Sequence, residues 1–341
     1  MSRFSRFRLG QRFIFIMTPS VLRRLPGVHI VSYVLLTLGL LNVLDCLPAT
    51  AAQSEGSYTV ETFRVGDAPF GLAFDGANIW VANGGSDTVT KLRASDGVVL
   101  GTFPVGDNPA CVAFDGANVW ITNALGNSVT KLRASDGAVL GTFPVGGAPV
   151  GVVFDGANIW VANSAFLSSS VTKLRASDGA LLGTFPVGGN APWGIVFDGT
   201  SVWTANQSSG NVSKLRASDG SLEGVFRVGS VPQFLAFDGT NIWVSVFGNN
   251  RVAKLRASDG TLLGRFASRR DPRAITFDGS SIWVCNAGTQ YVTELRASDG
   301  TFIASYKSGG SDTEGVVFDG ASIWVSNYSS DSVSKITLGN P

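Results

Sequence analysis

Short apolar runs separated by turn-forming residues recur from about residue 57 to the end of the chain. One unit extends from Ala68 to Gly106 and contains four such runs, at residues 69–74, 78–83, 88–93 and 98–105. Asp75-Gly76 separates the first two runs and is expected to supply the positive backbone dihedrals of a hairpin turn. The third run alternates apolar and polar side chains, as a strand covered on one side does. The unit is therefore predicted to form four antiparallel strands.

The second strand of this unit belongs to a ten-residue segment, FDGANIWVAN, that begins at Phe74. Related segments follow at steps of 40, 40, 43, 40, 40 and 41 residues, which gives seven copies. Repeats of this length form solenoids or propellers, and four strands in each unit favour a propeller, in which four-stranded blades surround a central channel. We therefore predict an all-β fold for residues 53–341, a seven-bladed β-propeller of four-stranded antiparallel blades.

The two ends of the repeat region are complementary. The last repeat has three strands before the chain ends at Pro341, and an unmatched strand at residues 58–66 precedes the first repeat. This strand aligns with the fourth-strand sequence at residues 101–106. We expect it to complete the seventh blade, which closes the ring non-covalently and leaves no interior edge unpaired.

One tryptophan stands at the same position of the second strand in every repeat. We expect these side chains to be structural and buried between adjacent blades, with a ring of ligand-stacking aromatics as the functional alternative. The seven residues are Trp80, Trp120, Trp160, Trp203, Trp243, Trp283 and Trp324. The recurrent Asp-Gly turns are likewise interpreted as geometry, because each Ser-Asp-Gly aspartate lacks the neighbouring oxygen ligands of a calcium site. The arginines before these turns are expected to be solvated or paired with turn carboxylates.

Residues 1–52 have the features of a secretory signal peptide. A basic segment precedes an apolar run at residues 28–44, and small residues follow it. Cleavage is expected near Ala51 or Ala52, which would place the mature chain outside the cytoplasm, in the periplasm, secreted or at the cell surface.

Two points about this segment stay open. The apolar run approaches the length that spans a bilayer, so an uncleaved membrane anchor is the alternative to a cleaved signal. The basic segment is also long for a signal, and a start at Met17 rather than Met1 would give a more ordinary length.

Composition excludes several classes of function. The signal holds six arginines and one acid, so the rest of the chain has 20 basic and 24 acidic side chains and provides no electrostatic footprint for nucleic acid. The only histidine, His29, lies in the signal, so the mature chain has none for a catalytic triad, a zinc site or a general base. We predict no cofactor, no metal and a monomer. Cys111 and Cys285 occupy different repeat positions and are expected to be free and buried.

The pattern Ile79-Trp-Val-Ala-Asn83, followed by a polar loop and Val89-Thr-Lys-Leu92, resembles the YVTN family of bacterial β-propeller repeats. The resemblance covers about residues 57–339 and implies the fold and an exported or surface protein. The chain is more distantly similar to the virginiamycin B lyase type of seven-bladed propeller, which opens a cyclic ester with a histidine base and a magnesium ion. No histidine of the mature chain can take that role, so this resemblance implies the fold and not the activity.

The copies differ most in the loops between the fourth and first strands and between the second and third. These loops lie at one end of the blades, opposite the nearly invariant Asp-Gly turns. By analogy with other propellers, a ligand is expected to bind at this end, around the mouth of the channel. One position at the start of the innermost strand differs in every copy and is expected to ring the mouth: Phe70, Ala110, Val150, Trp193, Gln233, Arg273 and Glu314.

The polar and charged members of this ring fall in repeats five to seven. The only dense charged run of the mature chain, residues 268–273, lies beside them and adds Arg269 and Arg270. A mouth that is half apolar and half charged suits an amphipathic small ligand or a peptide. Neutral drift of solvated loops is the alternative. Further candidates in the second-to-third-strand loops are Phe166, Phe247, Arg251, Tyr291 and Tyr328.

The leading hypothesis is an exported, non-catalytic propeller that binds a small ligand or a protein partner on its variable face. A second hypothesis is a metal-dependent lyase or lactone hydrolase at the same face, for which Asp271, Asp312 and Glu314 are the available acids. A third is a cell-surface adhesion or envelope scaffold protein. The absence of histidine from the mature chain favours the non-catalytic hypothesis over the second.

Overall fold

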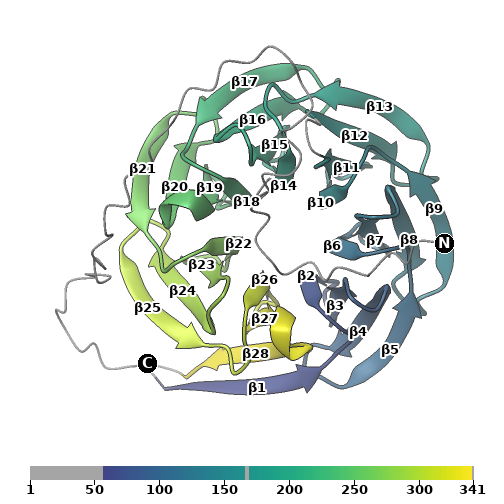
Figure 1. Cartoon of the computed structure of the whole chain (residues 1–341), viewed down its shortest axis with the longest axis vertical. Coiled ribbons are helices and arrows are strands. Elements are labelled where there is room, and N and C mark those ends of the chain that lie inside the picture. Colours follow the sequence, from purple (N-terminus) through teal and green to yellow (C-terminus); the bar gives the residue numbers. More distant parts are fainter. Residues whose placement is uncertain (1–56, 166–168, 340–341) are drawn as a thin grey trace, which may run out of the picture. The chain divides into compact units, whose positions relative to one another are not determined.

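The computed structural model describes residues 57–165 and 169–339. The predicted signal peptide and Phe166 lie outside the described residues. The described chain forms seven four-stranded antiparallel sheets around a central channel, which confirms the predicted seven-bladed β-propeller (Figure 1).

In each of the first six blades the strands follow one another from the channel outwards. Blades one to three consist of β2 (Pro69–Phe74), β3 (Asn78–Asn83), β4 (Thr88–Arg93), β5 (Val99–Pro104); β6 (Pro109–Phe114), β7 (Asn118–Asn123), β8 (Ser128–Arg133), β9 (Val139–Pro144); and β10 (Pro149–Phe154), β11 (Asn158–Asn163), β12 (Ser170–Arg175), β13 (Leu181–Pro186). Blades four to six consist of β14 (Pro192–Phe197), β15 (Ser201–Asn206), β16 (Asn211–Arg216), β17 (Leu222–Arg227); β18 (Pro232–Phe237), β19 (Asn241–Val246), β20 (Arg251–Arg256), β21 (Leu262–Ala267); and β22 (Pro272–Phe277), β23 (Ser281–Asn286), β24 (Tyr291–Arg296), β25 (Phe302–Lys307).

The seventh blade joins the two ends of the repeat region. It contains β26 (Thr313–Phe318), β27 (Ile323–Asn327), β28 (Ser332–Leu338) and, on the outside, β1 (Tyr58–Arg64). β1 pairs with β28 along its whole length, from Tyr58 opposite Leu338 to Arg64 opposite Ser332. The predicted closure by the N-terminal strand is therefore confirmed. Two single-turn 3₁₀ helices, η2 (Phe247–Asn249) and η3 (Tyr328–Ser330), lie in second-to-third-strand loops.

The seven repeated tryptophans are at most 1% exposed, and the hydrophobic clusters around them combine residues of adjacent blades. Their structural role was predicted, but the role of the preceding aspartate was not. Each indole Nε1 donates a hydrogen bond of 2.6 to 2.8 Å to the aspartate five residues earlier, as Trp80 does to Asp75. Each of these seven buried indole N–H groups therefore has the acceptor that a buried polar group requires.

The Asp75 turn differs from the prediction in its geometry. Of Asp75 and Gly76, only the glycine has a positive φ, of 96°. The Asp75 N–H bonds to the carbonyl of Asn78, so the two central residues of the turn are Gly76 and Ala77. The Asp75 carboxylate instead accepts the backbone N–H groups of Ala77 and Asn78. Burial would raise the pKa of Asp75, but the donors of Trp80, Asn78 and Ala77 together hold it below its usual value.

A lysine on the third strand connects most blades to the next. Lys91 Nζ donates a 2.6 Å hydrogen bond to the carbonyl of Ala134 in the following blade and lies 5.1 Å from the centre of the Trp80 ring. The same contacts recur at six of the seven junctions, from Lys91, Lys131, Lys173, Lys214, Lys254 and Lys335.

Blade six has Glu294 at this lysine's position, and the blade next to it is the one that closes the ring. The equivalent of Ala134 in blade seven is Leu338, which pairs with Tyr58 of β1. Glu294 accepts hydrogen bonds from the hydroxyls of Ser281 and Tyr306, and the Tyr306 ring packs edge-on against Tyr58. The one exception to the lysine repeat therefore lies at the non-covalent closure of the ring.

The arginines before the Ser-Asp-Gly turns pair with the turn aspartates, as one of the two expectations stated. Arg93 Nη1 lies 2.8 Å from Asp96 Oδ2, and the equivalent pairs in blades two to six are between 2.9 and 3.3 Å long. Both side chains of each pair are about half exposed, so each contributes little to stability. These residues belong to the scaffold.

Candidate functional site

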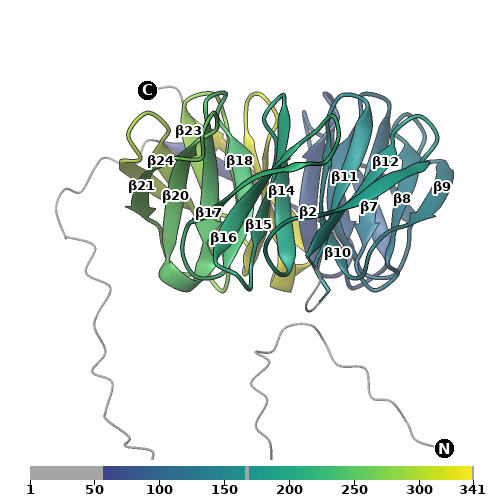
Figure 2. The same ribbon diagram turned by 90° about the horizontal axis from the view of Figure 1, so that it is seen from above.

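The two ends of the propeller differ in sequence and in chemistry. The turns after the first and third strands, with their Asp-Gly sequences, lie at one end, which we call the turn end. The loops after the second and fourth strands lie at the other, the variable end; Figure 2 shows the blades edge-on between the two. Each inner strand starts at the variable end, so its first residues surround that end of the channel.

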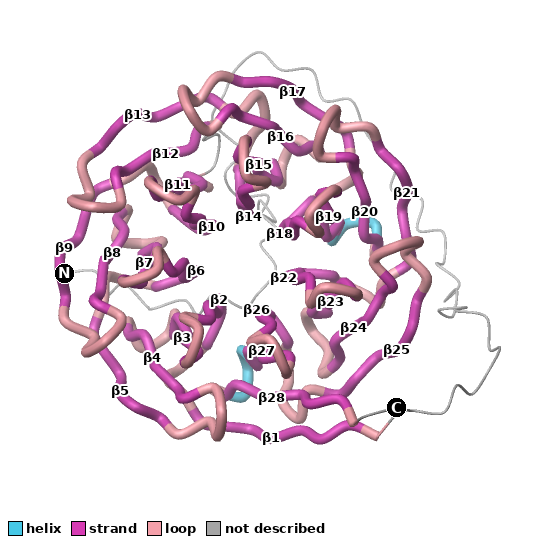
Figure 3. Tube along the Cα trace, turned by 180° about the vertical axis from the view of Figure 1, so that it is seen from behind, coloured by secondary structure: helices cyan, strands magenta, loops and turns pink. Residues whose placement is uncertain are grey.

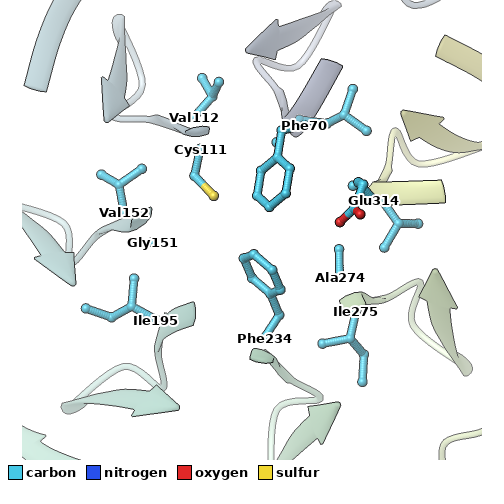
Figure 4. A pocket seen from close by; sticks show the side chains of 14 residues that line it. Phe70, Cys111, Val112, Gly151, Val152, Ile195, Phe234, Ala274, Ile275 and Glu314 are labelled. Carbon is cyan, nitrogen blue, oxygen red and sulfur yellow. The ribbon is translucent and has the colours of Figure 1, made fainter. Parts of the chain in front are cut away.

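A cavity of about 130 Å³ lies inside the channel. All seven blades line it with the second to fourth residues of their inner strands, so it lies towards the variable end. The rings of Phe70 and Phe234 meet inside it, and the Cys111 sulfur and the Glu314 carboxyl group point into it (Figure 4). The remaining walls are mainly glycine, alanine and branched aliphatic residues.

Phe70 and Phe234 come from blades one and five, on opposite sides of the ring (Figures 1 and 3). Their ring centres are 6.2 Å apart, with an angle of 51° between the planes, so the two side chains contact each other and narrow the channel. This contact gives the cavity an aromatic wall.

Phe234 was not predicted, although the sequence contains a signal for it. Glycine, alanine or cysteine occupies its position in the other six blades: Gly71, Cys111, Gly151, Gly194, Ala274 and Gly315. Adjacent inner strands approach closely here, since a Cβ added to Gly71 would lie 2.6 Å from the carbonyl oxygen of Ala110. A comparison of this third residue of the inner strand among the seven copies identifies Phe234 as the one large side chain.

Four predicted residues form a cluster at the variable end. Arg273 Nη1 lies 3.4 Å from Glu314 Oε2, and the Arg273 guanidinium lies 5.3 Å from the centre of the Phe247 ring in η2. Tyr328 of η3 lies near enough to Glu314 and Arg273 for both to act on its pKa, which burial raises above its usual value. The structure therefore brings together residues from blades five, six and seven.

Glu314 is 6% exposed, and its ionisation reflects that burial. Burial raises its pKa to about 7; the Arg273 guanidinium lowers the pKa, and the Asp312 carboxylate raises it. The group therefore changes its charge near neutral pH, whereas an exposed glutamate is ionised there.

Several buried polar atoms at the mouth have no hydrogen-bond partner among the described residues. They include Trp193 Nε1, Gln233 Oε1, Arg273 Nε and Glu314 Oε2. These four residues occupy the same repeat position in blades four to seven, and donors alternate with acceptors along the series. Buried polar atoms without partners are costly, and they concentrate here at the position that differs in every copy.

Three other predicted residues, Arg269, Arg270 and Tyr291, make their contacts outside this cluster. Arg269 stacks on Tyr291, 4.2 Å from the ring centre, and its Nε donates to the Ser305 hydroxyl. Arg270 is exposed and lies 3.5 Å from Asp271. Of the arginines in residues 268–273, only Arg273 therefore contacts Glu314. Of the apolar ring members, Ala110 and Val150 are buried.

Residues 57–165 and 169–339 contain no group of three or more histidine, cysteine, aspartate and glutamate side chains that could hold a metal ion. Cys111 and Cys285 are both free thiols, as expected; Cys285 is buried and Cys111 half-buried. In the same described ranges, no helix has the length and apolar character needed to cross a membrane.

No protein-family profile and no curated protein sequence matches the chain. Solved structures do match it. Virginiamycin B lyase from Staphylococcus aureus has a TM-score of 0.72 at 18% identity, over 83% of this chain and 100% of the lyase. A streptogramin B lyase has a TM-score of 0.71 at 19% identity, over 83% and 98% of the two chains. Hydrazine synthase from Kuenenia stuttgartiensis has a TM-score of 0.70 at 17% identity, over 86% and 99%.

These likenesses establish the fold alone, because the identities are low and the similar structures differ in activity. They confirm the distant similarity to the virginiamycin B lyase type of seven-bladed propeller that the sequence indicated.

Proposed function

We propose that this chain is an exported, non-catalytic β-propeller that binds a small amphipathic ligand or a peptide partner at the variable end of its channel. The observation that carries the proposal is the set of unpartnered buried polar atoms on Trp193, Gln233, Arg273 and Glu314. A bound ligand would supply their hydrogen bonds. Export rests on the N-terminal sequence.

The contrast with the turn end supports a role for the variable end. At the turn end, polar side chains satisfy one another, as the Asp75 carboxylate does with Trp80, Ala77 and Asn78. At the variable end, an apolar cavity adjoins polar atoms without partners. Apolar walls with a few convergent polar groups are typical of ligand sites. The cavity of about 130 Å³ is small, so it would accept one group of a ligand, with the remainder at the mouth.

The test is identification of a ligand that copurifies with the mature protein, followed by substitution at the mouth. Arg273→Ala and Trp193→Ala are each expected to weaken binding of that ligand by about tenfold, since each removes one buried hydrogen-bond donor. Calorimetric titration measures the affinities, and thermal melting confirms that each variant folds. Undiminished binding by both folded variants would exclude this site.

A second candidate is a metal-dependent lyase or lactone hydrolase. Two of the similar structures are lyases, and the pKa of Glu314, about 7, suits a general base near neutral pH. The lyase type to which the chain is similar uses a histidine base, and no histidine occurs after His29.

Millimolar magnesium or calcium is expected to leave the thermal midpoint of the protein unchanged within about 1 °C. An ion that bound the native state would raise the midpoint, and the described residues contain no cluster of ligands for one. Differential scanning fluorimetry measures this midpoint, with EDTA-treated protein as the reference. An increase of several degrees with either ion, lost in Glu314→Gln, would favour the enzyme over the binding protein.

A further inference from the structure

Glu314 is the one acidic side chain that lines the channel cavity among the described residues. Its carboxyl group points towards the interior beside Phe70 (Figure 4). Its Oε2 forms an ion pair with Arg273 Nη1 at 3.4 Å but accepts no hydrogen bond in the described chain. We propose that this cavity binds a primary ammonium group on a short apolar stem, with Glu314 as its ionic partner and the rings of Phe70 and Phe234 beside it. The inference rests on the proposed function, because it names the ligand chemistry of the same site.

The volume of the cavity sets the size of the stem. Its 130 Å³ is slightly less than the roughly 150 Å³ that accommodates a benzene molecule in an apolar protein cavity. A stem of about four to six carbon atoms therefore fits. The walls suit such a stem because they are aromatic, aliphatic or glycine except at Cys111 and Glu314.

The charges around the cavity favour a cation over an anion. Two acids, Glu314 and Asp312, lie here, with Asp312 close enough to raise the pKa of Glu314, and one base, Arg273, lowers that pKa. Arg273 is also held at the mouth by its contact with Phe247. The faces of Phe70 and Phe234 attract a cation through their quadrupoles. Burial raises the pKa of the Cys111 thiol to about 12, so Cys111 contributes a neutral, polarisable wall.

The same geometry makes the expected binding depend on pH. The charged and titratable groups that face Glu314 are Arg273 of β22, Cys285 of β23, Asp312 before β26 and Tyr328 of η3. The pKa values of Cys285 and Tyr328 are raised, so both stay neutral near pH 7. Glu314, with a pKa of about 7, is the group that titrates between pH 6 and 8. An ammonium ligand pairs with its ionised form, so affinity should increase by about tenfold from pH 6 to pH 8.

The experiment is calorimetric titration of the full chain with three four-carbon probes: n-butylammonium, n-butanol and butyrate. Butylammonium is expected to bind at least about tenfold more tightly than either other probe at pH 8, and to lose that advantage at pH 6. Glu314→Gln should remove both the preference and the pH dependence. Glu61→Gln, in the exposed part of β1, is the matched control and should behave as the unaltered protein.

Phe234→Ala tests the apolar half of the site with little risk to folding, because blade six carries Ala274 at the same position. It should weaken binding of butylammonium and butanol alike. A peptide with an acetylated N-terminus and one lysine extends the test to the source of the amine. Tighter binding of this peptide than of butylammonium indicates a lysine side chain of a partner, and weaker binding indicates a free amine.

Butyrate binding as tight as butylammonium, or a preference for butylammonium that survives Glu314→Gln, overturns the inference. Equal binding of butanol and butylammonium overturns it too, but leaves the cavity as the ligand site of the proposed function. If no probe binds, the inference fails as well, and the Arg273→Ala and Trp193→Ala assay decides the proposed function separately.

Discussion

Removal of residues 53–66 is expected to lower the thermal midpoint of the protein by more than about 10 °C. The deletion removes β1, which pairs with all seven residues of β28. It also removes Phe63, which stacks on Trp324 at 5.6 Å, and exposes the edge of the last blade. Phe63 is half-buried, so its loss costs less than the ~3–5 kcal/mol of a fully buried phenylalanine, but the pairing of β1 with β28 is lost with it. Each kcal/mol lowers the midpoint of a domain of this size by roughly 2–4 °C.

Phe63 also explains a repeated glycine. A Cβ added to Gly97, which has a φ of 72°, would lie 2.1 Å from the Phe63 ring. The outer strands of blades one to five and of blade seven therefore pack over the Ser-Asp-Gly turn of the next blade, and β1 provides this contact between blades seven and one. Scanning calorimetry of the truncated chain measures the loss. Glu61→Ala, an exposed change in the same strand, should shift the midpoint by less than about 1 °C. An unchanged midpoint after truncation would contradict closure by β1.

Trp160→Ala should cost about 3–5 kcal/mol of unfolding free energy, the range for a large aromatic removed from a core. Trp160 is fully buried, lies 5.5 Å from the Phe185 ring and donates to Asp155. The substitution leaves a cavity between two blades and a half-buried carboxylate without one of its donors. Its expected cost is therefore greater than that of the apolar contacts alone.

Trp193→Ala is the matched control, because it is the same change at the one tryptophan of the chain that lies outside the repeated position. Trp193 is half-buried at the mouth and its Nε1 has no partner in the described chain. It should cost less than about 1.5 kcal/mol, since it leaves no closed cavity and removes no hydrogen bond. Urea unfolding measures both variants. Similar losses from the two substitutions would contradict the separation between scaffold and site.

The scaffold could be predicted because it is repeated. Seven copies at steps near 40 residues define the blade, and the alternation within one copy defines its strands. The incomplete last repeat and the strand before the first repeat indicated closure. The Asp75 turn was only partly predicted, because an Asp-Gly dipeptide does not reveal that the carboxylate binds an indole five residues away.

The candidate site could be predicted only as a region. Comparison of the copies identified Arg273 and Glu314, and the structure places them 3.4 Å apart. The same comparison did not separate Arg273 from Arg269, which stacks on Tyr291 instead. Phe234 was not predicted, because its position holds a small residue in the other six copies and departs from the repeat only once.

The sequence by itself determined the number of blades, their four strands and the end of the propeller at which the copies differ, because these features repeat at fixed intervals. Only the tertiary structure decided which side chains enter the channel, because that depends on contacts between blades far apart in sequence. Phe70 meets Phe234 across the ring. Glu314 lies beside Arg273, and burial raises the pKa of Glu314 to about 7 although the Arg273 guanidinium lowers it. Repetition specifies the scaffold, whereas the chemistry of the channel depends on the residues that depart from the repeat.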